Sequence, residues 1–148
     1  MRSKRKKSFL HYLSPSIRIK GKQIIMELNI LSGKIIGIAM KVHTQLGPGL
    51  LESSYKNVLF HKMQETGLWV EKEKPVPLIS EGIKLKCGYR LDLLVENTIV
   101  VEVKSVNVLH PIHRAQVLTY LKTGGFPLGL LINFNVLHLR DGIKRIIL

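Results

Sequence analysis

The spacing of apolar side chains predicts two helices at the start of the folded part of the chain. Over residues 27–46 apolar positions recur at steps of three and four, which is typical of an amphipathic helix. The Gly-Pro-Gly sequence at 47–49 would end this helix. A second helix is expected over residues 51–65, where Gly67 follows. Its apolar face would consist of Leu51, Tyr55, Val58, Leu59 and Met63.

The apolar pattern then shortens to the period of strands. Strands are expected at 68–79, 83–96, 98–103, 128–134, 136–139 and 143–147. One helix is expected among them, at 111–122, with Ile112, Ala115, Leu118 and Leu121 toward the core. The first three strands are joined by tight turns and therefore form an antiparallel meander. The resulting order, ααβββαβββ, predicts an α/β fold, a single-domain sandwich of sheet and helices.

Length and composition narrow the class of protein. The 148 residues suit one domain, and 45% hydrophobic residues are enough for a core. The single cysteine, Cys87, excludes an internal disulfide framework and a cysteine-built zinc site. No apolar run reaches the roughly 18 residues that a spanning helix needs, so no membrane partner is expected.

The charge is concentrated at one end of the chain. The formal net charge is +13, from 23 Lys+Arg and 10 Asp+Glu, and it favours a polyanionic partner. Residues 1–22 hold eight of the basic residues and no acid, so they carry more than half of the excess. We expect residues 1–25 to be a basic extension, flexible or not native, before a folded domain at 26–148. A nucleic-acid-binding arm is the alternative interpretation of the extension.

A pair of carboxylates and a lysine form the sharpest chemical pattern. Asp92 stands in one apolar strand, and Glu102 and Lys104 end the next strand. The turn at 96–97 pairs these strands so that a residue near 92 lies opposite one near 102, and alternation puts Glu102 and Lys104 on one face. Such oxygen ligands suit Mg²⁺ or Mn²⁺, and the lysine could orient or deprotonate a water. An ordinary ion pair on a solvated strand is the alternative.

Three further residues strengthen the pattern. Glu52, at the start of the second helix, could bring a third carboxylate, although charge compensation of the helix N-terminus would also explain it. Gln116 and Tyr120 are four residues apart and share a face of the later helix. A surface glutamine and a tyrosine at the edge of the core would explain this pair equally well.

These motifs together resemble the GxxExxY family of small prokaryotic proteins, within the PD-(D/E)XK nuclease superfamily. The resemblance covers roughly residues 26–148 and leaves out the basic extension. Its motifs are Gly49-Leu-Leu-Glu52-Ser-Ser-Tyr55, the segment 88–97 around Asp92, Val101-Glu102-Val103-Lys104, the segment 115–121 with Gln116 and Tyr120, and Leu130-Leu-Ile-Asn-Phe134.

The resemblance implies a restriction-endonuclease-like fold, a mixed β-sheet flanked by helices. Glu52, Asp92, Glu102 and the carbonyl of Val103 would then hold Mg²⁺, with Mn²⁺ as the alternative. Lys104 would position or activate the attacking water. Leu91 stands where the superfamily's name has proline, at a position that is variable among its members.

By the same resemblance, Gln116 and Tyr120 match the helical QxxxY element of the RecB-like and lambda-exonuclease-like branch, which supports the site. His113 and Arg114 could contact phosphate at the helix start, although polar residues at a helix entry are also common there.

The implied function is that of a cytoplasmic prokaryotic nuclease that hydrolyses phosphodiester bonds, with DNA favoured over RNA. A homodimer or a protein partner could supply the specificity of so small a chain. The alternative is a non-catalytic nucleic-acid-binding or interaction protein that retains the fold.

Overall fold

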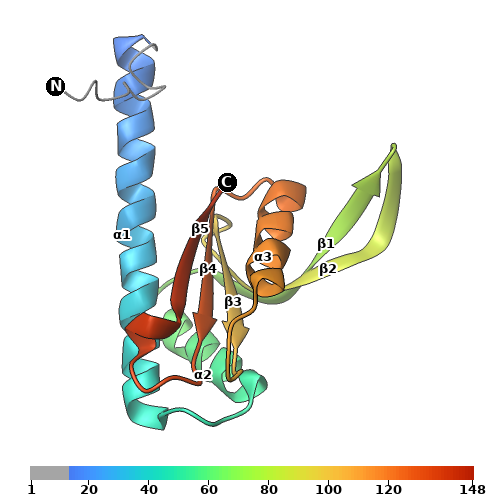
Figure 1. The fold of residues 1–148 in the computed structure, drawn as a ribbon. Coiled ribbons are helices and arrows are strands. Elements are labelled where there is room, and N and C mark those ends of the chain that lie inside the picture. The colour runs from blue at the N-terminus through green and yellow to red at the C-terminus, as the bar shows by residue number, and fades with distance from the viewer. Residues whose placement is uncertain (1–13) are drawn as a thin grey trace, which may run out of the picture. The chain divides into compact units, whose positions relative to one another are not determined.

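The computed structural model describes residues 14–148, apart from the side chains of Ile17, Lys86 and Cys87. The chain divides into two compact units, residues 1–34 and 35–148. Helix α1 (Pro15–Leu46) begins twelve residues before the expected position 27 and contributes to both units (Figure 1). The predicted extension 1–25 lies outside the described residues as far as residue 13, and its residues 15–25 are helical.

One helix among the described residues, Arg18–Leu46, is long and apolar enough to cross a membrane by length and composition. The expectation that no segment reaches this threshold is therefore wrong. Isolated polar residues such as Glu27 and Lys34 interrupt every long apolar run, but they leave the mean hydropathy of the best 18-residue window of this helix at 1.3.

The second unit contains a five-stranded sheet in the described part of the chain, in the order β1-β2-β3-β4-β5. The strands are β1 (Val70–Ser80), β2 (Ile83–Val95), β3 (Ile99–Lys104), β4 (Leu128–Asn133) and β5 (Ile143–Ile147). β3 and β4 are parallel and every other pair is antiparallel. Helix α3 (Pro111–Gly124) covers one face and α2 (Glu52–Glu65) lies against the other (Figure 1). The predicted α/β class and the opening antiparallel meander are confirmed.

One predicted strand, at 136–139, is absent from the sheet. The chain after β4 instead forms a bend and a short 3₁₀ helix, η2 (Leu139–Gly142). The carbonyl oxygen of Val136 bonds to His43 Nε2 at 2.8 Å, and Gly142 packs so closely on the backbone of Asn133 that a Cβ would lie 2.2 Å from its carbonyl oxygen. These contacts fold the segment back on the end of β4, so the order is ααβββαββ.

The core confirms most of the expected face of α2 and part of that of α3. Tyr55, Leu59 and Met63 are fully buried as predicted, but Leu51, expected on the same face, precedes the helix and is 74% exposed. On α3 the predicted Leu121 is fully buried together with Val117 and Tyr120, whereas the predicted Ile112 is 69% exposed. The predicted face included Ile112 and Ala115 because they are apolar, but the face of α3 that packs on the sheet is centred on Val117, Tyr120 and Leu121.

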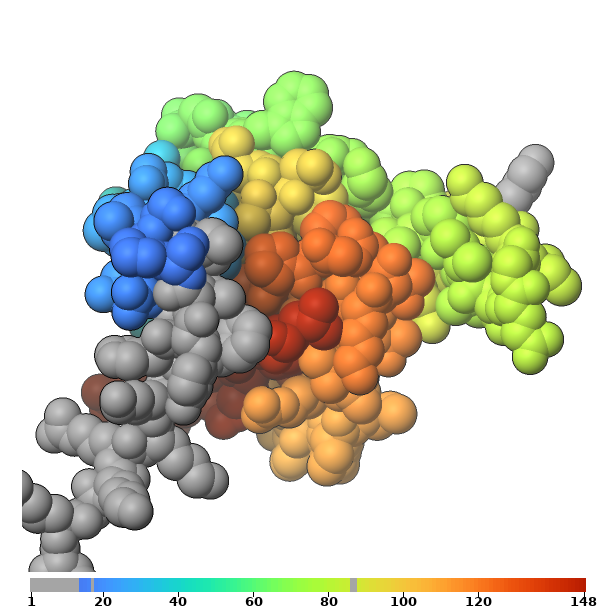
Figure 2. Space-filling model, turned by 90° about the horizontal axis from the view of Figure 1, so that it is seen from above, coloured from blue at the N-terminus to red at the C-terminus, as the bar shows by residue number. Residues whose placement is uncertain are grey.

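The β1–β2 hairpin is bent where its register shifts, between Val76 and Leu78. Gly88 lies at this bend, and a Cβ there would approach the carbonyl oxygen of Val76 to 2.5 Å, so only glycine fits. The outer part of the hairpin projects beyond α3 (Figure 2). The inner part of β2 stays in the sheet and carries Asp92 to its position beside β3.

Candidate nuclease site

The loop before α2 is shaped by Tyr55. Its hydroxyl donates to the carbonyl oxygen of Gly47 and accepts the N–H of Leu50 at 3.2 Å, while its ring stacks on Phe134 at a centroid distance of 4.5 Å. Gly49 supplies a φ of 94°, which side chains rarely tolerate. The Gly-x-x-Glu-x-x-Tyr spacing therefore builds a loop that delivers Glu52 as the first residue of α2. Sequence reasoning treated Tyr55 as packing only.

The predicted register between β2 and β3 is confirmed. The paired residues run from Val95↔Ile99 to Leu93↔Val101, which continues to Asp92 opposite Glu102. At that point the Asp92 carboxylate itself accepts the N–H of Val103, at 2.9 Å from Oδ2. The side chain of Asp92 is thus fixed against the end of β3.

Glu102 lies beside Asp92 in a very different state. Its side chain is buried, with the residue 4% exposed, and Oε2 has no hydrogen-bond partner in the part of the chain that the structure describes. Burial raises the pKa of Glu102 to about 9, and the charge of Asp92 and a hydrogen bond with it add to the rise. A carboxylate in this position needs a proton or a cation.

Lys104, Gln116 and Tyr120 gather around this pair of carboxylates. The charge of Lys104 acts on Glu102 and opposes the rise in its pKa. Tyr120 is 4% exposed, and its pKa is raised to about 12, first by burial and then by the charges of Glu102 and Asp92. A hydrogen bond with Gln116 acts in the opposite direction. The charges of Asp92 and Glu102 thus act on Tyr120, that of Lys104 acts on Glu102, and Gln116 meets this group through Tyr120.

Glu52, the sixth, lies close by but turns elsewhere. Its Oε2 accepts the N–H of Ser105 at 3.4 Å, and the Ser105 hydroxyl donates to the carbonyl oxygen of Leu50 at 2.6 Å. Ser105 follows Lys104, the last residue of β3, so the Glu52 carboxylate lies next to the end of that strand. Over the described residues, no group of three or more His, Cys, Asp or Glu is close enough to hold a metal ion.

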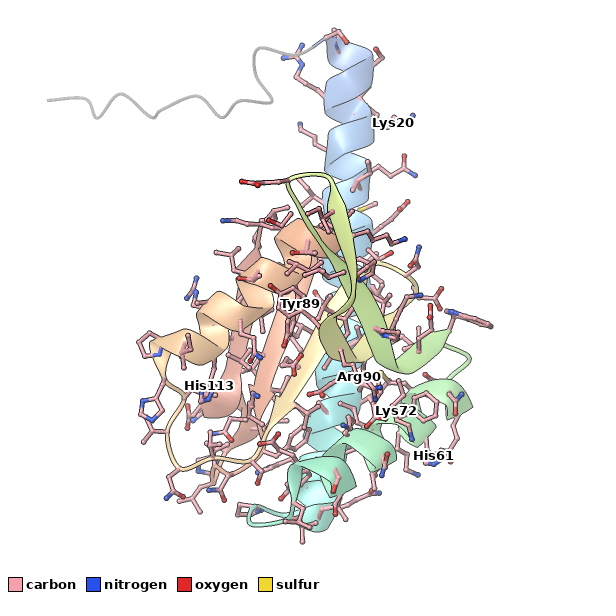
Figure 3. The ribbon with its side chains drawn as sticks, turned by 90° about the vertical axis from the view of Figure 1, so that its right-hand side faces the viewer. Lys20, His61, Lys72, Tyr89, Arg90 and His113 are labelled. Carbon is pink, nitrogen blue, oxygen red and sulfur yellow. The ribbon has the colours of Figure 1, made fainter. Side chains whose placement is uncertain are left out.

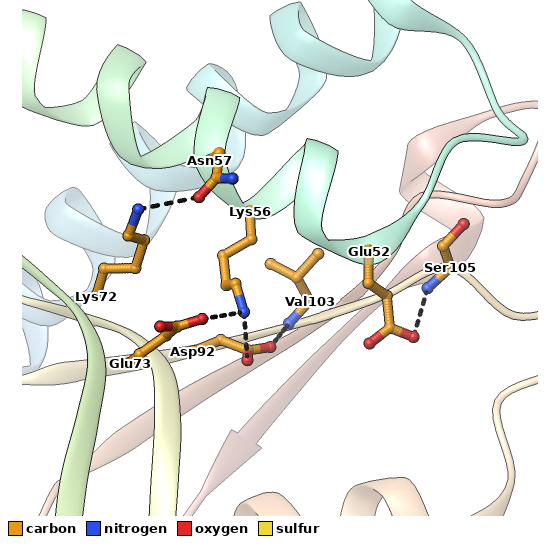
Figure 4. A network of polar contacts seen from close by, with 8 residues as sticks. All are labelled: Glu52, Lys56, Asn57, Lys72, Glu73, Asp92, Val103 and Ser105. Carbon is orange, nitrogen blue, oxygen red and sulfur yellow. Dashed lines mark hydrogen bonds and ion pairs between the residues drawn. The ribbon is translucent and has the colours of Figure 1, made fainter.

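A lysine that sequence reasoning missed completes the network. Lys56 Nζ lies 3.1 Å from Glu73 Oε1 and 3.6 Å from Asp92 Oδ1 (Figure 4). Lys56 follows Glu52 by four residues, so both lie on one face of α2, and that spacing was the available signal. Glu73, on β1, has no comparable signal in the sequence.

The two residues proposed to contact phosphate lie at the start of α3. His113 Nδ1 accepts the N–H of His110 at 3.0 Å, which caps the helix, and Arg114 is exposed. In Figure 3 His113 lies on the side of α3, whereas Lys72 and Arg90 lie on the side of the hairpin and α2. The structure gives His113 a structural role, and its contact with phosphate remains a prediction.

Comparison with known proteins adds a family. Residues 29–146 match the family described as the PD-(D/E)XK nuclease superfamily. No curated protein and no solved structure matches the chain. The mixed sheet flanked by helices is consistent with the restriction-endonuclease-like fold. On this match, which spans most of its length, the chain belongs to the PD-(D/E)XK nuclease superfamily.

Proposed function

We propose that this protein is a metal-dependent nuclease that hydrolyses phosphodiester bonds, with DNA favoured over RNA and Mg²⁺ or Mn²⁺ as the cofactor. The observation that carries the proposal is the buried Glu102 carboxyl, whose Oε2 has no partner within the described residues. Glu102 lies near the end of the central strand β3, beside the carboxylate of Asp92. Two adjacent carboxylates repel each other when both are ionised, and a cation between them removes that cost.

The donor set fits a hard divalent cation. Asp92 and Glu102 offer carboxylate oxygens, which Mg²⁺ and Mn²⁺ prefer over nitrogen and sulfur ligands. Glu52 and the carbonyl of Val103 are the further ligands of the proposal. The contact of Glu52 with Ser105, at 3.4 Å, is long for a hydrogen bond and restrains that carboxylate only weakly.

The residues around the carboxylates have separate roles in this mechanism. A bound cation would neutralise charge on the phosphoryl oxygens and would lower the pKa of a water molecule that it binds. Lys104, whose positive charge acts on Glu102, orients the attacking water; to accept the proton of that water, its ammonium group would first give up a proton of its own. Gln116 orients the buried Tyr120 beside the carboxylates through a hydrogen bond.

The proposal includes the narrower assignment to the GxxExxY family and the contact of His113 and Arg114 with substrate. Gly49, Glu52 and Tyr55 support the first, because each has a defined part in the loop before α2. The exposed position of Arg114 on the first turn of α3 supports the second, since a helix N-terminus favours phosphate.

The test is a cleavage assay on the full chain. Single- and double-stranded DNA and RNA are incubated with Mg²⁺, Mn²⁺ or EDTA, using the wild type, Glu102→Gln and the control Glu65→Gln. Glu65 is exposed at the end of α2. We expect metal-dependent cleavage that Glu102→Gln abolishes and Glu65→Gln retains. Failure to cleave any substrate would overturn the proposal in favour of a non-catalytic binding protein.

A further inference from the structure

Lys56 places a positive charge inside the site before any metal binds. Its side chain is only 16% exposed, and lysine is seldom buried to this extent unless it is paired. The ammonium group lies between two carboxylates, 3.1 Å from Glu73 Oε1 and 3.6 Å from Asp92 Oδ1 (Figure 4). Asp92 is itself only 20% exposed, so this is a partly buried ion pair with an acid of the proposed metal site.

Glu73 is held in a strained backbone conformation to make this contact. Its φ is 54°, a region that non-glycine residues rarely occupy. It stands between the paired residues Lys72↔Leu93 and Lys74↔Leu91, directly across from Asp92 in the β1–β2 register. Backbone strain of this kind persists where the surrounding structure fixes it, and it is concentrated at functional sites.

One ammonium group serves two carboxylates in this position. Lys56 Nζ is within ion-pair distance of Glu73 and Asp92 at once. It compensates the charge of Asp92 from the side of α2, whereas Glu102 Oε2 has no hydrogen-bond partner in the described structure.

We propose that Lys56, anchored by Glu73, is a built-in cation that takes the place of a second divalent ion beside Asp92, so that the protein binds a single metal ion. This inference rests on the proposed function, because it presumes that Asp92 and Glu102 hold the first ion. Lys56 acts through Asp92 and is a positioning residue. Removing its charge frees the Asp92 and Glu73 carboxylates for a second cation.

The experiment measures how many Mn²⁺ ions the full chain binds, by isothermal titration calorimetry with no substrate present. We expect one ion for the wild type and two for Lys56→Gln. Lys56→Arg keeps the positive charge and should bind one. Lys72→Gln is the matched control, because Lys72 donates to Asn57 at 3.0 Å instead of pairing with Asp92, and it should also bind one.

The outcomes separate this inference from the proposed function. A wild type that binds one ion and a folded Lys56→Gln that also binds one would overturn the inference alone. Two ions in the wild type would do the same. A wild type that binds no Mn²⁺ would overturn the proposed function as well. Circular dichroism checks that each variant is folded, and if Lys56→Gln is not, Lys56→Met replaces it.

Discussion

Asp92 on β2 and Glu102 on β3 are neighbouring carboxylates whose surroundings differ in charge. Asp92 accepts the N–H of Val103 and pairs with Lys56, so its negative charge is compensated. Glu102 is more deeply buried and retains an oxygen with no partner among residues 14–148. The fold supplies a cation to Asp92 and leaves Glu102, on the adjacent strand, in need of one.

The difference shows where the folded protein favours function over stability. A buried carboxyl without a partner is costly, and a protein that kept it only for structure would gain by replacing it. The raised pKa of Glu102 reflects that cost in the metal-free chain. We infer that Glu102, on β3, is placed to bind a ligand, whereas the charge of Asp92, on β2, is already compensated within the protein.

The largest expected effect lies on the β3 side, in the rate of cleavage. Lys104→Ala removes the group proposed to orient or deprotonate the water, and it should lower the rate by about 10²–10⁴-fold. The measurement is Mg²⁺-dependent DNA cleavage, with Lys122→Ala as control, because Lys122 is exposed in the last turn of α3. Circular dichroism should be unchanged. Full activity in Lys104→Ala would remove this lysine from the mechanism.

The next effect is on stability against pH in the absence of metal. The pKa of Glu102 is raised from 4.5 to about 9, so between these values the unfolded chain is ionised there and the folded chain is not. The free energy of unfolding should therefore fall as pH rises, by up to ~1.4 kcal/mol per pH unit from this group. Below pH 4.5 Glu102 is protonated in both the folded and the unfolded chain, so the stability it contributes is fully present there.

Glu102→Gln removes this dependence, so the variant should melt at a higher temperature than the wild type at pH 8 in EDTA. The two proteins should converge toward pH 4.5. Thermal unfolding at several pH values measures the difference, with Glu65→Gln as the control at an exposed site. Parallel curves for wild type and Glu102→Gln would show that Glu102 is ionised in the fold and that the contrast with Asp92 does not exist.

Metal addition should reverse the effect of pH on the wild type. A cation that binds only the folded chain raises its free energy of unfolding by about 2.7 kcal/mol at 100 times the dissociation constant. The gain should be larger at pH 8 than at pH 5, because a proton on Glu102 competes with the cation. Melting curves with and without Mg²⁺ measure it. An equal gain in Glu102→Gln would place the ion elsewhere.

The smallest expected effect is on the free energy of unfolding, and it concerns the loop that carries Glu52, the third carboxylate of the proposed metal site. Tyr55→Phe removes the hydroxyl that binds Gly47 and Leu50 but keeps the ring on Phe134. We expect a loss of about 0.5–1.5 kcal/mol, measured by urea unfolding. Tyr89→Phe is the control, because Tyr89 meets Tyr120 through its ring. No loss in Tyr55→Phe would mean that the hydroxyl does not hold the Glu52 loop.

The central pair of carboxylates could be predicted from the sequence because local rules determine it. The tight turn at 96–97 sets the register of β2 and β3, and strand alternation then puts Glu102 and Lys104 on one face. The helical spacing of Gln116 and Tyr120 likewise survives in α3. These predictions depend on residues close in sequence, where few alternatives compete.

The residues that compensate Asp92 could not be predicted in the same way. Glu73 faces Lys56 because Glu73 itself has a positive φ inside strand β1. A glutamate in the sequence gives no sign of that conformation. The bend at 136–139 depends on His43, more than 90 residues earlier. The exposed Ile112 shows that apolar character alone did not identify the face of α3 that meets the sheet.

A crystal structure of the full chain grown with Mn²⁺, with anomalous scattering data collected to locate the ion, tests whether Asp92 and Glu102 share one cation. We expect an anomalous peak bonded to carboxylate oxygens of both Asp92 and Glu102, with Lys56 still against Asp92. Crystals with Mn²⁺ in excess that show Glu102 without a bound ion would contradict it.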